Sequence, residues 1–142
     1  MAAQKIFVTE TATLHFVWFG NGTTGWPRIV HGGALATIMD ESFGRFAARQ
    51  VKERTAVTAY LKTNYLEKCE PGQWYVILVG LDAAHEGDQT EKKKYLSGFL
   101  ACCEGNGPKL NGDVIEDVHP HVVGNALFVV PKKQTPPIPD EF

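Results

Sequence analysis

The sequence predicts an α+β domain in which an antiparallel sheet of five to six strands wraps around one long central helix. Two patterns carry this prediction: a single helical segment follows the first strand-like segment, and four further strand-like segments follow without alternating helices. The length of 142 residues fits one domain, and an apolar share of 44% is enough for a core. We expect the domain to span residues 1–131 and a proline-rich, disordered tail to span residues 132–142.

The helical pattern lies in residues 33–50. Large apolar side chains recur along one stripe at helical spacing, namely Leu35, Ile38, Met39, Phe43 and Phe46. The opposite side carries mostly small residues rather than charged ones. A helix of this kind is typical of burial on nearly all sides, so we expect it to cross the whole sheet.

The strand-like segments are rich in β-branched and aromatic residues. They comprise residues 6–19, 55–66, 73–84, 95–103 and 122–130. Within the second segment, simple alternation places Thr58 and Tyr60 on one face and Leu61 and Tyr65 on the other. An irregular, acidic stretch, residues 111–121, precedes the last strand.

Charge and composition exclude several classes of protein. Lys and Arg number 14 against 16 Asp and Glu, which argues against a nucleic-acid-binding domain. No apolar stretch approaches the length of a membrane span, and no targeting segment is evident. Three cysteines, Cys69, Cys102 and Cys103, have no metal-ligand spacing and are expected as reduced thiols. We expect an intracellular protein, cytoplasmic or mitochondrial.

The segment with the clearest chemical meaning begins at His31-Gly32-Gly33. Two glycines at a helix start expose backbone N–H groups at the positive end of the helix dipole, where a carbonyl oxygen gaining negative charge is stabilised. The alternative is that the glycines only form a tight turn into the helix.

Asp40 lies two turns into the expected helix. Its neighbours three and four residues away include no cation, whereas Glu41 has Arg45 at the helical spacing of an ion pair. A carboxylate kept in a small-residue groove near the glycines is a candidate base or nucleophile. The alternatives are a partner remote in sequence or a place in a subunit interface.

These residues, together with a second motif, resemble the hotdog-fold acyl-CoA thioesterase superfamily. Six residues separate His31-Gly32-Gly33 from Asp40, and the segment 58–65 (TAYLKTNY) is similar to the strand that follows the helix in that superfamily. The nearer relatives are the phenylacetate-pathway-type and the thioesterase-superfamily-member enzymes. The resemblance covers about residues 10–131 and implies the hotdog fold.

The resemblance also implies roles for individual residues. Gly32 would donate its N–H to the thioester carbonyl, and His31 would shape the turn or add a donor. Asp40 would activate water or attack directly, and Thr58 would position the water or the carboxylate. In that superfamily the site is shared across a homodimer, with dimers of dimers possible. No cofactor is implied beyond coenzyme A as part of the substrate.

Further residues are weaker candidates. Gly33, Tyr60 and the run Lys92, Lys93 and Lys94 are candidate substrate contacts, the lysines for coenzyme A phosphates, although such runs are usually solvated. His119 and His121 have no further ligand at suitable spacing, so we expect no metal. Gly25 stands where some relatives carry an amide side chain, which favours medium- to long-chain acyl groups.

The predicted function is hydrolysis of acyl-CoA to free acid and coenzyme A. Two alternatives stay open from sequence: a non-catalytic acyl-CoA-binding protein on the same fold, and a hydratase acting on enoyl-CoA. The second is disfavoured because no suitably placed pair of histidine and carboxylate is evident.

Overall fold

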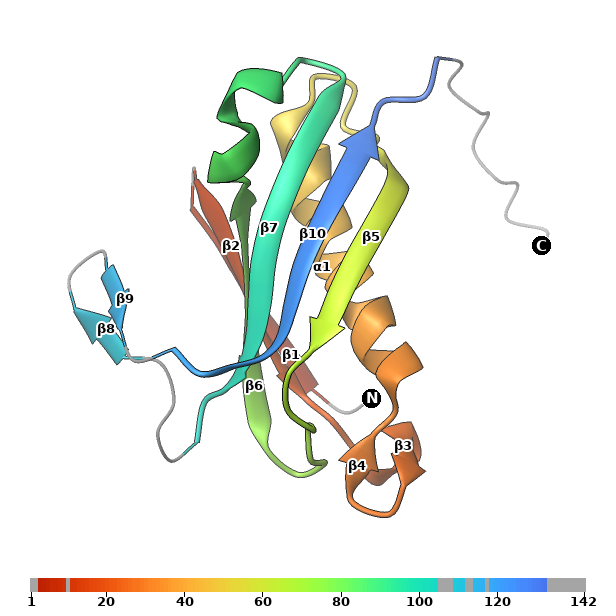
Figure 1. The fold of residues 1–142 in the computed structure, drawn as a ribbon, viewed down its shortest axis with the longest axis vertical. Helices are drawn as coiled ribbons and strands as arrows, with labels where there is room; N and C mark the ends of the chain where they lie inside the picture. The colour runs from red at the N-terminus through yellow and green to blue at the C-terminus, as the bar shows by residue number, and fades with distance from the viewer. Residues whose placement is uncertain (1–2, 10, 105–108, 112–113, 117, 133–142) are drawn as a thin grey trace.

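The computed structural model describes residues 3–9, 11–104, 109–111, 114–116 and 118–132. Its main sheet has six strands, and every neighbouring pair is antiparallel (Figure 1). In spatial order they are β1 (Ala3–Val8), β2 (Ala12–Trp18), β6 (Trp74–Leu81), β7 (Lys93–Cys102), β10 (Pro120–Val129) and β5 (Val57–Tyr65). The predicted sheet of five to six antiparallel strands is confirmed. The tail predicted for residues 132–142 lies outside the described residues beyond Lys132.

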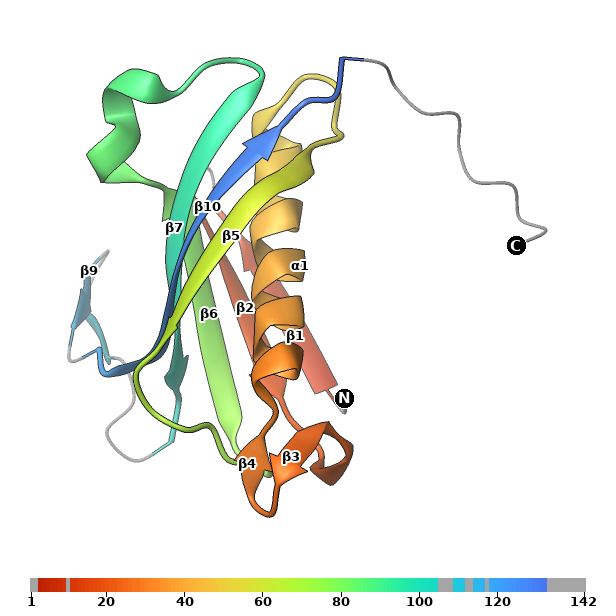
Figure 2. The same ribbon diagram turned by 45° about the vertical axis from the view of Figure 1, so that its right-hand side comes forward.

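Helix α1 (Gly32–Gln50) lies along one face of this sheet, which curves around it (Figure 2). The five apolar residues of the predicted stripe are all buried against the sheet. The expectation that the helix is buried nearly all round is wrong for the single chain, because Thr37 and Arg45 on the opposite side are exposed. The sheet covers one side of the helix and leaves the other open.

Two glycines let the helix approach the sheet closely. Gly98 of β7 and Gly124 of β10 are direct cross-strand partners beneath Phe43. A Cβ atom at Gly98 would lie 2.9 Å from the Phe43 ring, and one at Gly124 would lie 3.1 Å from it. Side chains there would push the helix off the sheet, so this pair fixes the depth at which α1 sits.

Strand β5 forms one edge of the sheet and carries a bulge. Leu127 of β10 pairs with Tyr60 and Phe128 pairs with Thr58, so Ala59 is the extra residue. The bulge turns Thr58 to the same face as Leu61, toward the helix. The predicted alternation, which put Thr58 beside Tyr60, is therefore wrong at this residue, and Tyr60 faces away from the helix.

The remaining elements are short. They are η1 (Asn21–Thr23), β3 (Thr24–Trp26), β4 (Ile29–Val30), η2 (Ala83–Asp88), β8 (Lys109–Asn111) and β9 (Val114–Glu116). The stretch 111–121, expected to be irregular, contributes to a small antiparallel hairpin of β8 and β9. The segment 6–19, expected as one strand, belongs to two strands, because the chain turns back between Thr9 and Ala12.

A membrane-spanning helix was not expected from the sequence. Among the described residues, none of the helices combines the length and the apolar character needed to cross a bilayer.

Candidate active site

The start of helix α1 is capped by a histidine side chain. His31 is the N-cap residue, and its Nδ1 accepts a hydrogen bond of 2.8 Å from the Gly33 N–H. The neutral ring therefore carries its proton on Nε2. The His31 backbone N–H donates to the Thr23 carbonyl at 2.7 Å, which holds the backbone of the cap residue against the preceding loop. The Gly33 amide is thus engaged within the chain.

The Gly32 amide differs from that of Gly33. Within the described part of the chain, no acceptor is assigned to the Gly32 N–H, and the residue is exposed at the helix N-terminus. The Gly32 carbonyl accepts a hydrogen bond of 3.0 Å from the Tyr65 hydroxyl. The peptide between Gly32 and Gly33 is therefore held at its oxygen by Tyr65 and at its N–H by His31, which orients the neighbouring Gly32 N–H outward. Sequence reasoning assigned no role to Tyr65.

Asp40 and Thr58 meet where the helix faces the edge strand. The Thr58 hydroxyl donates to Asp40 Oδ1 at 2.7 Å. Asp40 is half-buried and Thr58 is exposed, so one face of the carboxylate remains open. The partner is remote in sequence, as one of the alternatives proposed. Glu41 pairs with Arg45 at 2.7 Å, as its spacing predicted.

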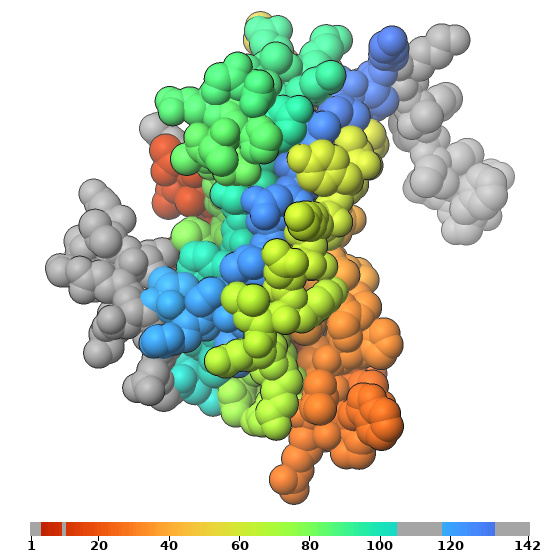
Figure 3. All heavy atoms as spheres, in the orientation of Figure 1, coloured from red at the N-terminus to blue at the C-terminus, as the bar shows by residue number. Residues whose placement is uncertain are grey.

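Within one chain, the Gly32 amide and the Asp40 carboxylate are far apart. Gly32 and Asp40 are eight residues apart on the helix, about 12 Å along its axis. Both stand beside β5, with Tyr65 contacting the helix start and Thr58 contacting its middle. Figure 3 shows the yellow-green β5 beside the orange helix start on the open surface.

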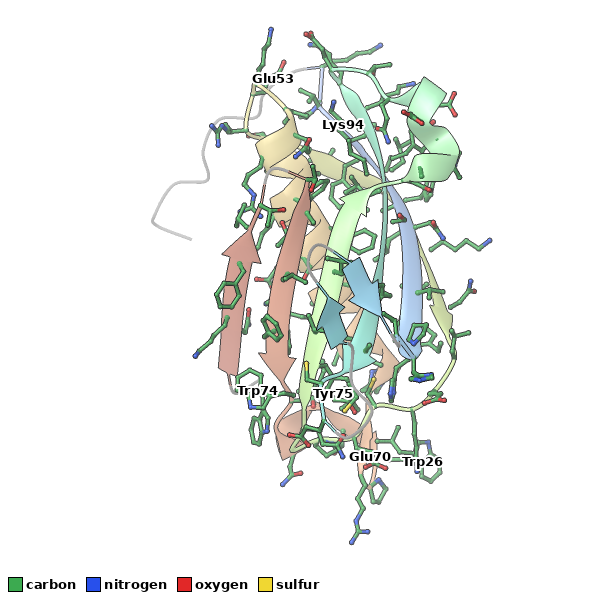
Figure 4. The ribbon with its side chains drawn as sticks, turned by 90° about the vertical axis from the view of Figure 1, so that its left-hand side faces the viewer. Trp26, Glu53, Glu70, Trp74, Tyr75 and Lys94 are labelled. Carbon is green, nitrogen blue, oxygen red and sulfur yellow. The ribbon has the colours of Figure 1, made fainter. Side chains whose placement is uncertain are left out.

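The structure does not bring Tyr60 or the lysine run to the helix start. Tyr60 lies on the opposite face of β5 from Asp40 and is 45% exposed. The lysines lie near the C-terminal end of α1, where Lys92 Nζ is 3.9 Å from Glu53. Figure 4 shows Glu53 and Lys94 at one end of the molecule and Trp26 at the other. Lys94 pairs with Phe128, which pairs with Thr58, so Lys94 and Thr58 share one row across three strands.

His121, one of the two histidines considered as metal ligands, has other contacts. His121 Nδ1 donates to the Lys68 carbonyl at 2.8 Å, and its Nε2 lies 3.6 Å from the Glu67 carboxylate. In the described ranges, no cluster of three or more histidine, cysteine or acidic residues is arranged to hold a metal ion.

Two of the three cysteines, Cys69 and Cys103, are poor candidates for nucleophiles. Burial raises the pKa of Cys69 to about 12 and that of Cys103 to about 11. Both thiols therefore stay protonated near neutral pH.

A second polar cluster, which sequence reasoning missed, lies between α1 and β2. The His15 Nδ1 accepts a hydrogen bond from the Ser42 hydroxyl, and its Nε2 donates to Gln4 Oε1 at 2.8 Å. His15 and Ser42 are fully buried. Burial lowers the pKa of His15 below its ordinary value; Glu41 opposes this shift and Arg45 adds to it. The imidazole is therefore neutral.

Comparison with known proteins supports the hotdog resemblance. Residues 28–80 match the family model of the thioesterase superfamily, a segment that contains Gly32, Asp40 and Thr58. A search of curated proteins finds no significant match. The predicted resemblance to hotdog-fold thioesterase-superfamily proteins is confirmed by this match together with the solved structures below.

Three solved structures are similar over almost the whole chain. A Streptococcus mutans protein bound to acetyl-CoA is 13% identical, with a TM-score of 0.69 over 94% of this chain and 92% of that chain. A hypothetical thioesterase from Streptococcus pneumoniae with coenzyme A is 12% identical, with a TM-score of 0.67 over 90% and 88%. The PaaI protein of the E. coli phenylacetic acid degradation operon is 11% identical, with a TM-score of 0.66 over 89% and 82%. These likenesses establish the fold.

Proposed function

We propose that this hotdog-fold protein, whose residues 28–80 match the thioesterase superfamily, hydrolyses the thioester of an acyl-CoA to a free acid and coenzyme A. The observation that carries the proposal is the open carboxylate of Asp40, held by Thr58 at 2.7 Å on the helix whose start presents the Gly32 amide. Two solved structures of the same fold are described as bound to acetyl-CoA and to coenzyme A, which supports this class of substrate.

In the proposed reaction, the Gly32 N–H donates to the thioester carbonyl oxygen, which gains negative charge as the carbonyl carbon is attacked. Asp40 takes a proton from the attacking water, and the tetrahedral intermediate collapses with cleavage of the carbon–sulfur bond. The proton passes to the departing thiolate, giving the acid and the thiol. Direct attack by Asp40, with an anhydride that water then hydrolyses, uses the same residues. Thr58 holds the carboxylate in either route, and His31 fixes the donor.

A second copy of the chain is needed to complete this site. The separation of about 12 Å along the helix between Gly32 and Asp40 is too large for one carbonyl group to contact both. Among the residues that the structure describes, no strand pairs with the outer side of the edge strand β5. Because Tyr65 and Thr58 lie toward opposite ends of β5, antiparallel pairing of two copies along this edge would bring the Gly32 of one copy toward the Asp40 of the other. We therefore propose a homodimer, with a dimer of dimers possible.

The lysine run fits the phosphates of coenzyme A best through Lys94. Lys94 lies in the same cross-strand row as Thr58, two strands away, which is a distance of roughly 10 Å from the residue that holds Asp40. Lys92 is engaged near Glu53. We propose that the coenzyme A phosphates contact the protein near Lys94. Tyr60, on the opposite face of β5, is not assigned a role at the Asp40 carboxylate.

The experiment that tests the function is release of free thiol from several acyl-CoAs by the purified protein, with binding of each acyl-CoA measured in parallel by calorimetry. Turnover that depends on acyl-CoA supports the hydrolase. Binding without thiol release would contradict it and identify a non-catalytic binder, and hydration of an enoyl-CoA without thiol release would identify a hydratase.

A further inference from the structure

A groove of about 510 Å³ lies on the open side of helix α1, next to the helix start. His31 and Gly33 line one end, and Glu41 lines the other. Between these ends it is lined by Ala34, Thr37 and Ile38 of the helix and by Phe19 and Thr23 of the segment before it. Its volume is within the range of small-molecule sites in proteins.

The walls of this groove are suited to hydrocarbon. Its apolar lining comes from Phe19, Ala34 and Ile38, of which Ala34 is only half-buried. The Thr37 hydroxyl donates to the Gly33 carbonyl at 2.8 Å, and the Thr23 hydroxyl donates to the Gly20 carbonyl at 2.8 Å. Both threonines thus satisfy their hydroxyl donors within the chain, so an apolar ligand can cover them without leaving a donor unpaired.

The two ends of the groove define its occupant. The near end is continuous with the helix start, where the Gly32 N–H is proposed to hold the thioester carbonyl. The far end is a charged pair, because Glu41 is 2.7 Å from Arg45. Hydrocarbon laid over this pair would remove water from both charges at a cost in free energy, so an apolar chain should stop before it. The distance from Gly33 to Glu41, about 12 Å along the helix, matches an extended acyl chain of about ten carbons.

We propose that this groove binds the acyl chain of the substrate, that its preferred occupant is a straight medium-length chain, and that Thr37 and Glu41 set the length. The inference rests on the proposed thioesterase function and adds the substrate class. Shorter acyl groups and phenylacetyl groups occupy only the end near Gly33 and do not reach Glu41.

The test is the profile of kcat/KM over acetyl-, butyryl-, octanoyl-, decanoyl-, dodecanoyl- and palmitoyl-CoA, with phenylacetyl-CoA added. We expect the wild-type optimum at octanoyl or decanoyl groups. Thr37→Phe fills the middle of the groove, so decanoyl-CoA should lose at least about tenfold in kcat/KM while acetyl-CoA changes by less than about threefold. Glu41→Leu removes the carboxylate at the far end and leaves the exposed Arg45 side chain free to turn into solvent, so the optimum should move to dodecanoyl or longer groups.

Ala48→Phe is the matched control, because it adds the same bulk to the open face of α1 beyond Glu41 and should leave the profile unchanged. Circular dichroism and size-exclusion chromatography establish that each variant is folded. If Thr37→Phe is not folded, Glu41→Leu alone tests the proposal. An optimum chain length in Glu41→Leu that equals that of the wild type contradicts the proposal.

The outcomes separate the two proposals. Suppose that the wild type is active and that both variants keep its chain-length profile, or lose kcat/KM equally for all chain lengths. This result overturns the groove assignment but not the proposed hydrolase function. A Thr37→Phe protein that elutes as a smaller species than wild type would assign the groove to contact between copies and overturn the acyl site. A wild type that releases no thiol from any substrate overturns the proposed function, and the groove assignment falls with it.

Discussion

Of the polar contacts between helix α1 and the sheet, two pairs lie on opposite sides of the helix and differ in their access to solvent. Asp40 and Ser42 are two residues apart, about 200° around the helix, so they face opposite edges of the sheet. Ser42 bonds to His15 of β2 in a fully buried, neutral cluster. Asp40 bonds to Thr58 of β5, which is the edge strand of the sheet in the described part of the chain.

The difference between these pairs separates structure from function. The Ser42–His15 cluster is closed, and its donors and acceptors are matched to one another, as expected of groups that hold a fold. The Asp40–Thr58 pair leaves a carboxylate open beside a surface that needs a partner. We therefore expect substitutions at the first pair to change stability and substitutions at the second to change catalysis.

The largest expected effect is that of Asp40→Asn. The substitution keeps the shape and an acceptor for Thr58 but removes the base or nucleophile, so turnover should fall by about a thousandfold or more. Thermal unfolding should change little. The measurement is thiol release with acyl-CoA, with Asp88→Asn, at an exposed carboxylate in η2, as the matched control. Near-normal turnover in the Asp40 variant would remove it from the mechanism.

Next in size is the contrast between the two glycines. A Cβ atom at Gly32 would lie 3.9 Å from the Tyr65 ring, so Gly32→Ala should fold normally while the added methyl keeps the carbonyl away from the amide. A loss of about 100-fold in kcat/KM is expected. A Cβ atom at Gly33 would lie 2.9 Å from His31 Nδ1, so Gly33→Ala should also lower the melting temperature. Normal activity in Gly32→Ala would show that the substrate does not approach this amide.

For the closed pair, the expected effect is on stability. Ser42→Ala leaves the buried His15 Nδ1 without its donor and should lower the free energy of unfolding by about 1–3 kcal/mol. The kcat/KM of the folded variant should be within about twofold of wild type, since the cluster does not touch the site. A large loss of kcat/KM in Ser42→Ala without a change in the free energy of unfolding would contradict the structural role assigned to this pair.

The same pair predicts a pH dependence. The folded protein keeps His15 neutral, with a pKa below the ordinary value of 6.5, while the unfolded chain protonates it at that value. The unfolded state therefore binds more protons as the pH falls through about 6.5, and stability falls with it; above that range the contribution is constant. Urea unfolding at about pH 7.5 and about pH 5 should show a larger drop for wild type than for His15→Gln.

The smallest expected effect belongs to Tyr65→Phe. Losing the hydroxyl releases the Gly32 carbonyl but leaves the ring, so kcat should fall by about threefold to tenfold with little change in KM. An unchanged kcat would mean that the His31 cap alone orients the helix start. Single-turnover measurement of thiol release separates this effect from product release.

Much of the fold followed from local patterns. The apolar stripe from Leu35 to Phe46 predicted α1 to within one residue of its start, and the absence of further helices predicted an antiparallel sheet. The two strands within residues 6–19 were not separated, because Thr9 and the residues after it lack strong turn chemistry and the reversal depends on hydrogen bonds between Thr9 and Ala12. The hairpin of β8 and β9 was not predicted, although Asn111-Gly112, between Leu110 and Val114, is a sequence typical of a hairpin turn.

The site was predictable in its residues more than in its geometry. The motifs placed Gly32 and Asp40 on one helix, but the bulge at Ala59 inverts the face of Thr58, and alternation along the strand cannot reveal an extra residue. The His31 cap and the Tyr65 hydrogen bond depend on the loop conformation and on how β5 packs against the helix. The contact between His15 and Ser42 could not be predicted, because the two residues are 27 positions apart in the chain.

Co-expression of two differently tagged variants tests the shared site most directly. One copy carries Asp40→Asn and the other Gly32→Ala, and the mixed species is isolated through both tags. If two copies combine the Gly32 of one with the Asp40 of the other, each homogeneous variant is nearly inactive, while the mixed dimer has one intact site and about half of the wild-type turnover. Mixed dimers no more active than the two separate variants would contradict a site shared between subunits.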